Sequence, residues 1–243
     1  VELLVRLLKT GSTAEKTQAA GVLWHLAGNQ DNQIMIVNAG AVGGLVHLLK
    51  TGIAGKTWAV GALKKLAWNA DNQILIVRAG AVEPLVELLR SGNIDEKTQA
   101  AGALKYLASS SDNQVTIALA GAAEPLVQLL RTGNAAGMIQ AVGALRNLAL
   151  NTSNNVVVLR AEDVQPLVQH LRHSDAVGKT QAAGAIRNLA NVTEYQMAIA
   201  QAGALEPLVD LSENGDVDQK REAAGALRKL KRNSCIQMPV VQV

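Results

Sequence analysis

One ten-residue phrase recurs six times along this chain, and its regular spacing constrains the fold more than any other feature. The copies read QAAGVLWHLA from Gln18, WAVGALKKLA from Trp58, QAAGALKYLA from Gln99, QAVGALRNLA from Gln140, QAAGAIRNLA from Gln181 and EAAGALRKLK from Glu222. Their glycines are separated by 40, 41, 41, 41 and 41 residues. A fixed period of this length is typical of repeat proteins, in which each unit packs only on its neighbours.

Two further phrases keep the same period. The first reads LVRLLKTG from Leu4, LVHLLKTG from Leu45, LVELLRSG from Leu85, LVQLLRTG from Leu126, LVQHLRHS from Leu167 and LVDLSENG from Leu208. The second reads DNQIMIVNAGAV from Asp31, DNQILIVRAGAV from Asp71, DNQVTIALAGAA from Asp112, a degraded SNNVVVLRAEDV from Ser153 and EYQMAIAQAGAL from Glu194. Each repeat therefore contains three apolar segments with helical spacing.

Glycine and proline mark the ends of these segments. The Ala-Gly pair predicts the end of a short first helix, because glycine can adopt the left-handed conformation that closes a helix. Proline is expected in the first turn of the second helix, where its missing N–H costs no hydrogen bond. The prolines at this position are Pro84, Pro125, Pro166 and Pro207. The third helix is predicted to be the longest.

The composition suits an intracellular helical protein of the cytoplasm or nucleus. Hydrophobic residues make up 49% of the 243 residues, but only 2% are aromatic and none is Phe, so Ala, Leu and Val must fill the core. The single cysteine, Cys235, cannot form an internal disulfide. No apolar run approaches the roughly 18 residues that a membrane span needs, and the N-terminus does not read as a secretory signal.

The unit of about 41 residues, in which AGAVEPLVELLRSG is followed by QAAGALKYLA, resembles the armadillo repeat of β-catenin and importin-α. The resemblance covers residues 1–233 and implies an all-α fold, a right-handed α-solenoid of six three-helix repeats. Tetratricopeptide and ankyrin repeats have periods of about 34 and 33 residues and do not fit. A HEAT-like fold, with a similar repeat length but two helices, is the structural alternative.

We expect one armadillo-repeat domain over residues 1–233, followed by a C-terminal tail over 234–243. The approximate repeats are 1–38, 39–78, 79–119, 120–160, 161–201 and 202–233. Val1 aligns with Val82, so the first repeat is truncated and lacks its short first helix. Because terminal repeats ordinarily need a polar cap, this end is a candidate for self-association. The tail is expected to be loose, with a strand or a groove-docking segment as the alternatives.

One face of the third helix is the candidate binding surface. The residues of the first repeat that are expected to pack inward are Ala19, Ala20, Leu23, Leu26 and Ala27. The family resemblance implies that the opposite face lines a concave groove. The candidate peptide-binding residues stand three and four positions after each glycine: Trp24, His25, Lys64, Lys65, Lys105, Tyr106, Arg146, Asn147, Arg187, Asn188, Arg228 and Lys229.

The charge on this face favours an acidic partner. Together with the position seven after the glycine, these positions carry eight cations and no carboxylate, although the whole chain has a net charge of only +3. Such segregation favours an extended, acidic peptide. Asn147 and Asn188 are expected to bond to its backbone, since an amide both donates and accepts. The alternative explanation is compensation of the helix dipole, which is worth about 0.3 to 1 kcal/mol for each cation.

The repeated glycines set this surface apart from that of importin-α. The importin pattern places Trp on this helix, and Asn four residues later, to hold a basic nuclear-localisation peptide. Here Gly occupies the Trp position in all six repeats, and Asn follows only at Asn147 and Asn188. A nuclear-transport adaptor is therefore disfavoured, and the charge pattern is more similar to the groove of β-catenin. Because Gly costs a helix about 0.5 to 1 kcal/mol relative to Ala, the glycines indicate either a close approach or inheritance from one duplicated unit.

No catalytic, metal or cofactor site is expected. Cys235 lies in the tail, and the four histidines are scattered over several repeats, so no nucleophile and base converge. His170 and His173 are one turn apart, but no Cys or carboxylate completes a metal site. The glycines of AGAVGGLVHLL, from Ala39, do not follow the phosphate-loop pattern.

These observations favour a non-enzymatic scaffold for protein–protein interaction. The alternatives are a nucleic-acid-associating array and a purely structural one. Nucleic acid is the disfavoured partner, because single-stranded RNA needs stacking aromatic residues in each unit and Trp24 and Tyr106 are isolated in the sequence.

Overall fold

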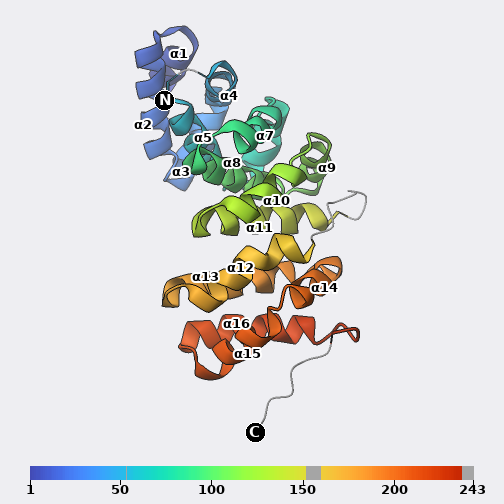
Figure 1. Ribbon diagram of the computed structural model, residues 1–243. Helices are drawn as coiled ribbons and strands as arrows, with labels where there is room; N and C mark the ends of the chain where they lie inside the picture. The colour runs from blue at the N-terminus through green and yellow to red at the C-terminus, as the bar shows by residue number, and fades with distance from the viewer. Residues whose placement is uncertain (53, 152–159, 237–243) are drawn as a thin grey trace. The chain divides into compact units, whose positions relative to one another are not determined.

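The structure, a computed structural model, describes residues 1–52, 54–151 and 160–236. In these ranges the chain forms sixteen α-helices and no strand, as the sequence predicts (Figure 1). The helices belong to two compact units, Val1–Pro125 and Leu126–Val243. We call them unit 1 and unit 2.

Unit 1 repeats the predicted order of first, second and third helix. Its helices are α1 (Glu2–Thr10), α2 (Thr13–Leu26), α3 (Gln30–Asn38), α4 (Ala41–Thr51), α5 (Lys56–Leu66), α6 (Ala70–Arg78), α7 (Val82–Ser91), α8 (Ile94–Leu107) and α9 (Ser111–Leu119). The third helices are α2, α5 and α8, and α5 packs on both of the others. The α1 and α2 helices correspond to the second and third helices of the first repeat.

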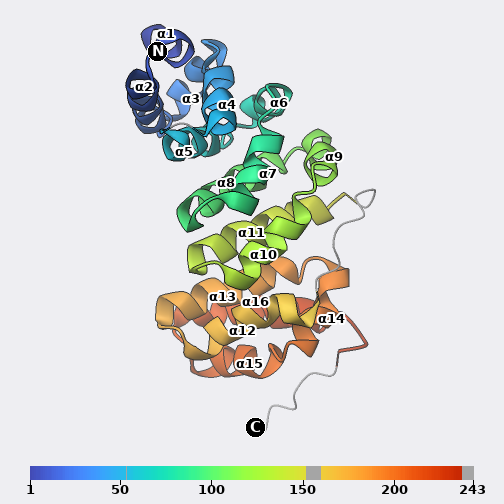
Figure 2. The same ribbon diagram turned by 45° about the horizontal axis from the view of Figure 1, so that its top comes forward.

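Unit 2 has the same plan. Its helices are α10 (Ala123–Thr132), which begins just before the unit boundary, α11 (Ala135–Ala149), α12 (Ala161–His173), α13 (Ala176–Leu189), α14 (Thr193–Gln201), α15 (Leu205–Asn214) and α16 (Val217–Leu230). The third helices are α11, α13 and α16, and α13 packs on both of the others (Figure 2). The first helix expected within SNNVVVLR falls mostly outside the described residues, as does most of the expected tail.

The glycines end the first helices as predicted. Gly40, Gly80, Gly121 and Gly203 follow α3, α6, α9 and α14 with φ angles of 81°, 77°, 73° and 77°, in the left-handed region. Pro84, Pro125 and Pro207 lie in the first turns of α7, α10 and α15, also as predicted.

The prediction for Pro166 is wrong, because this residue lies inside α12 rather than in its first turn. The phrase AED replaces AGA in this repeat, so no glycine is present to end a helix before the proline. The helix begins at Ala161 instead, and the backbone N–H of Arg160 donates to the Asp163 carboxylate at 2.8 Å.

The DNQ motif and its EYQ variant connect the first helices α3, α6, α9 and α14 to the third helices before them. The Gln73 side chain donates to the carbonyl of Ala67 at 3.1 Å, and the Asn72 side chain donates to the carbonyl of Leu66 at 3.2 Å. The same Gln contact is made by Gln33, Gln114 and Gln196. The motif thus supplies donors to carbonyls at the end of the third helix, where they have no partner within the helix.

The third helices bury the face that the sequence predicts. Ala19, Ala20, Leu23 and Ala27 are buried in α2, while Leu26 is half-buried. The opposite face carries the candidate binding residues. No single helix of the described chain is long and apolar enough to cross a membrane; α3 and α4 meet that test only as a pair, bent by 82°.

Candidate peptide-binding surface

The twelve predicted binding residues lie on the six third helices, two on each helix. We call Trp24, His25, Lys64, Lys65, Lys105 and Tyr106 the unit 1 surface. We call Arg146, Asn147, Arg187, Asn188, Arg228 and Lys229 the unit 2 surface. His25 and Arg228 are exposed, and the other ten residues are half-buried.

An aromatic cluster forms where α2 meets α5. The Trp24 ring lies 5.1 Å from the Trp58 ring and 4.6 Å from the His25 ring, measured between centroids. A second pair joins Trp68 and Tyr106, whose centroids are 5.9 Å apart. The sequence-based expectation that Trp24 and Tyr106 are isolated is therefore wrong, because partners from the neighbouring repeat complete each pair.

The glycines of the repeated phrase leave room for side chains from adjacent helices. A Cβ atom added at Gly61 would lie 2.7 Å from Cδ1 of Trp24, and one added at Gly225 would lie 2.6 Å from Cδ of Arg187. Gly21 is less crowded, with the Trp58 ring at 3.7 Å. The close approach of a side chain from the preceding third helix therefore gives a structural reason for glycine at positions 61 and 225.

Two of the predicted cations bind the preceding third helix. The Lys65 ammonium group donates to the carbonyl of Trp24 at 2.9 Å and lies 4.1 Å from the centre of the Trp24 ring. Lys229 repeats the first contact, donating to the carbonyl of Arg187 at 3.2 Å. Both carbonyls lie near the C-terminus of a helix, where cations are favoured. The helix-end explanation therefore accounts for Lys65 and Lys229.

Lys64 and Lys105 form the basic centre of the unit 1 surface. The Lys64 ammonium group donates to Oε1 of Gln99 at 3.1 Å. Burial lowers the pKa of Lys64, and the positive charges of Lys105 and Lys65 lower it further. Burial also lowers the pKa of Lys105, whose ammonium group lies 4.5 Å from the centre of the Tyr106 ring. An anion placed here would relieve the repulsion between these groups.

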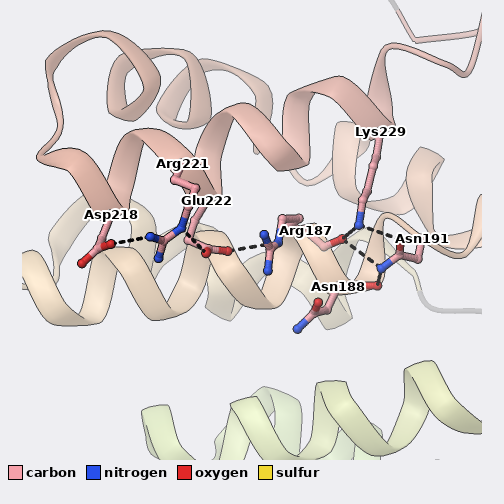
Figure 3. Close-up of polar contacts among 7 residues, drawn as sticks. All are labelled: Arg187, Asn188, Asn191, Asp218, Arg221, Glu222 and Lys229. Carbon is pink, nitrogen blue, oxygen red and sulfur yellow. Dashed lines mark hydrogen bonds and ion pairs between the residues drawn. The ribbon is translucent and has the colours of Figure 1, made fainter.

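A carboxylate lies beside the unit 2 surface, at a position outside the predicted binding residues. Nε of Arg187 lies 3.0 Å from Oε2 of Glu222, and Nε of Arg221 lies 3.4 Å from Oε1 of the same residue. Figure 3 shows this chain of charges continuing to Asp218, which is 2.8 Å from Arg221. The Arg187–Glu222 contact is an ion pair without the alignment of a hydrogen bond.

Around Lys229 the charge is again positive. Its ammonium group donates to Oδ1 of Asn191 at 2.6 Å. Burial lowers the pKa of Lys229, as do the charges of Arg187, Arg146 and Arg232, whereas Glu222 opposes this shift.

The unit 2 surface contains the two predicted asparagines, Asn188 on α13 and Asn147 on α11. The Asn188 amide points away from the Arg187–Glu222 pair (Figure 3), and it makes no hydrogen bond within the described part of the chain. It is therefore open to a ligand backbone. Asn147 is half-buried on α11.

Three residues beside these surfaces lie outside the positions predicted from the sequence: Trp58, Gln99 and Glu222. Trp58, Gln99 and Glu222 all stand three positions before the repeated glycine. Residues three before and four after a glycine are seven positions, or nearly two helical turns, apart, so they share a face. The position three before the glycine therefore belongs to the predicted face, and including it identifies all three residues.

The two surfaces present cations, amides and aromatic rings. Within the described ranges, no group of three or more His, Cys, Asp or Glu gathers as a metal site would require. Three-helix repeats whose third helices present such a face define the class of helical-repeat binding scaffolds.

The chain belongs to the armadillo-repeat family. The family model for the armadillo/β-catenin-like repeat matches residues 69–109, 155–191 and 193–230. A search of curated proteins gives no match.

Solved structures support the same assignment. The chain is similar to an engineered protein solved by the Northeast Structural Genomics Consortium, with 31% identity, a TM-score of 0.79, and coverage of 95% of this chain and 96% of the other. It is also similar to a designed armadillo repeat protein in complex with the peptide (KR)4, with 26% identity, a TM-score of 0.77, and coverage of 94% and 98%. Computationally designed armadillo repeat proteins for modular peptide recognition give 26% identity, a TM-score of 0.75, and coverage of 94% and 98%.

Proposed function

We propose that this protein is a non-enzymatic scaffold whose third helices bind an extended peptide segment with acidic side chains. The observation that carries the proposal is the state of Lys64, a half-buried ammonium group bonded to the neutral Gln99 and repelled by Lys105 and Lys65. Burying like charges together disfavours the free protein, whereas a carboxylate among them would be held by charge-assisted hydrogen bonds.

The exposed aromatic residues beside these lysines add an apolar component to the proposed ligand. Trp58 is 40% exposed and Trp68 is 47% exposed, so part of each ring is open to contact. Aromatic residues at the centre of a binding surface commonly supply much of the affinity. The segment that fits unit 1 thus combines acidic side chains with apolar ones.

The length of the segment follows from helix packing. Neighbouring helices lie about 8 to 10 Å apart, so the path from α2 across α5 to α8 spans roughly 20 Å. An extended peptide advances about 3.3 Å per residue, which gives roughly six residues on the unit 1 surface.

The designed relative with (KR)4 offers a sharp comparison, since its peptide is basic. We expect this chain to prefer the opposite sign. Fluorescence anisotropy with three labelled peptides of equal length, one rich in Glu, one with Gln in place of Glu, and (KR)4, tests the proposal. The Glu peptide should bind most tightly, and Lys64→Glu and Lys105→Glu should each weaken it, whereas Lys9→Glu, an exposed change on α1, should not. Equal binding of (KR)4, or no effect of either substitution, would show the proposal to be wrong.

Single-stranded nucleic acid is the second candidate, favoured by the Trp24–Trp58 and Trp68–Tyr106 pairs beside lysines. Bases stack on aromatic rings, and their phosphates bind cations. One face of Trp24 is already occupied by Lys65, which leaves less ring surface for stacking. Anisotropy with a labelled single-stranded RNA at two salt concentrations distinguishes the candidates, because phosphate contacts weaken steeply with salt.

A further inference from the structure

A polar cavity lies at the C-terminal ends of α13 and α16 in unit 2, next to Lys229 of the unit 2 surface. It has a volume of about 410 Å³ and is lined mainly by Asn191, Thr193, Gln196, Lys229, Arg232 and Asn233. This volume falls in the range of small-molecule sites. The lining contains two cations and no carboxylate.

The Lys229 ammonium group is held by two hydrogen bonds and has a third N–H bond that neither of them uses. Its ammonium group donates to the carbonyl of Arg187 at 3.2 Å and to Oδ1 of Asn191 at 2.6 Å. Asn191 is itself held, because its side-chain NH2 donates to the carbonyl of Asn188 at 3.1 Å. Since an ammonium group carries three N–H bonds, one remains for a ligand.

Arg232 and Asn233 add further donors. Arg232 is exposed, and within the described residues its guanidinium group makes no hydrogen bond or ion pair. Oδ1 of Asn233 accepts from the backbone N–H of Cys235 at 3.1 Å, which leaves the side-chain NH2 of Asn233 as a donor. The Thr193 hydroxyl can donate as well.

The site is specific to the last repeat. The residue seven after the repeated glycine is Arg232 in α16's repeat, whereas the same position in α5's repeat is Trp68. Lys229 has a counterpart in Lys65, which caps the preceding helix in the same way. Helix capping therefore explains Lys229 in part, whereas the Arg232 side chain makes no contact with a carbonyl or carboxylate within the described residues.

We propose that this cavity binds a phosphate monoester, with Lys229 and Arg232 meeting its charge and Asn233 and Thr193 bonding to its oxygens. A carboxylate offers one charge and two oxygens, but a phosphate monoester carries close to two charges and three acceptor oxygens. Two cations and at least two neutral donors match the phosphate better. A phosphorylated Ser or Thr of a bound peptide is one source of this group, and that form rests on the proposed function; free phosphate is the other.

Isothermal titration calorimetry of the full chain with inorganic phosphate, O-phosphoserine and glutamate tests the cavity directly. We expect both phosphates to bind and glutamate to bind at least tenfold more weakly. Arg232→Met should weaken phosphate binding about tenfold or more, as expected for a charged hydrogen bond, whereas Lys231→Met, an exposed neighbour outside the cavity, should leave it unchanged. Thermal unfolding of both variants checks that each is folded.

Binding of phosphorylated and unphosphorylated peptides distinguishes a phosphorylated peptide residue from free phosphate as the ligand. A peptide with phosphoserine should bind more tightly than its Ser form in the parent chain, and this gain should vanish in Arg232→Met. Equal binding of glutamate and phosphoserine, an unchanged Arg232→Met, or a single-stranded oligonucleotide that displaces phosphoserine at equal concentration would each overturn the proposal. Phosphate binding that survives while the Glu-rich peptide fails would leave the cavity intact and refute only the proposed peptide function.

Discussion

Trp24 of α2 lies across Gly61 of α5, so closely that a methyl group at residue 61 would stand 2.7 Å from Cδ1 of the ring. The ring is also held from its other neighbours, by Trp58 at 5.1 Å between centroids and by the Lys65 ammonium group at 4.1 Å. The missing side chain at Gly61 of the second repeat thus makes room for the aromatic ring of Trp24 on the preceding repeat.

The first prediction follows from this contact. Gly61→Ala should destabilise the protein by about 1 to 3 kcal/mol, because the added methyl group forces the Trp24 ring to move. Gly21→Ala is the matched control: its added Cβ would lie 3.7 Å from the Trp58 ring, an ordinary contact. This control should gain up to about 0.5 to 1 kcal/mol from helix propensity. Urea unfolding followed by tryptophan fluorescence measures both, and equal effects of the two changes would contradict the argument.

Adjacent lysines on α5 should respond in opposite ways to the same substitution. Lys65→Met removes the hydrogen bond to the Trp24 carbonyl and the contact with its ring, so we expect a loss of about 1 to 2 kcal/mol of stability. Lys64→Met removes a half-buried charge whose pKa is lowered by burial and by Lys105, so it should raise the unfolding midpoint.

The same Lys64→Met substitution should also change peptide binding. Lys64→Met should weaken the acidic peptide while it stabilises the free protein, since residues kept for binding are often unfavourable for stability. Anisotropy and urea unfolding on the same samples test the pair. A Lys64→Met variant that is less stable and binds normally would show that Lys64 is structural.

Much of the fold could be predicted from the sequence, for a physical reason. The 41-residue spacing of QAAGVLWHLA and its copies reports units that pack on identical neighbours, so helix number, helix order and the buried face of α2 follow from periodicity. The glycines at 40, 80, 121 and 203 required positive φ and have it. The prediction for Pro166 was wrong because its repeat has no glycine to end a helix before the proline.

The candidate site was harder to predict, because its character depends on contacts between repeats. The face of the third helix was predictable from helical geometry, but whether a lysine there is free or used was not. Lys65 and Lys64 are sequence neighbours, yet one caps the preceding helix and the other donates to the next. Likewise, nothing in a single repeat shows that Glu222 lies beside Arg187.

The DNQ motif gives a prediction about stability alone. Asn72→Ala should cost about 1 to 3 kcal/mol, because its buried side chain donates to the carbonyls of both Gln33 and Leu66. Asn32→Ala, at the same position one repeat earlier, should cost less, since Asn32 is only half-buried and donates to the carbonyl of Leu26. Urea unfolding midpoints of the two variants test this ranking of stability losses. A larger loss of stability for Asn32→Ala than for Asn72→Ala would contradict it.

Binding of the acidic peptide should depend on pH in the alkaline range. Lys64 is a base with a lowered pKa, so it loses its proton at a lower pH than the ordinary value of 10.5. The peptide binds the charged form, so affinity is complete below the lowered pKa and falls as pH rises through it. The decline should therefore begin below pH 10.5.

Arginine variants provide the control for this pH dependence. Because the pKa of Lys105 is lowered as well, the double variant Lys64→Arg with Lys105→Arg is the appropriate protein. A guanidinium group stays charged to above about pH 12, so affinity in this variant should stay level over the same range. A decline of equal size in the double variant would assign the pH dependence to other groups.

The Arg187–Glu222 pair yields the last prediction. Because the Glu222 carboxylate stands 3.0 Å from Nε of Arg187, it occupies the place that a ligand carboxylate would take. Glu222→Gln should therefore strengthen binding of acidic peptides about threefold to tenfold, while lowering stability by about 1 kcal/mol, a modest figure because Arg187 is 36% exposed. Asp218→Asn removes the same charge, but within the described residues the only ion pair of Asp218 is with the exposed Arg221, so this change should alter neither quantity by more than about 0.5 kcal/mol. If Glu222→Gln instead weakened the acidic peptide, Glu222 would be holding Arg187 in its binding position rather than competing for it.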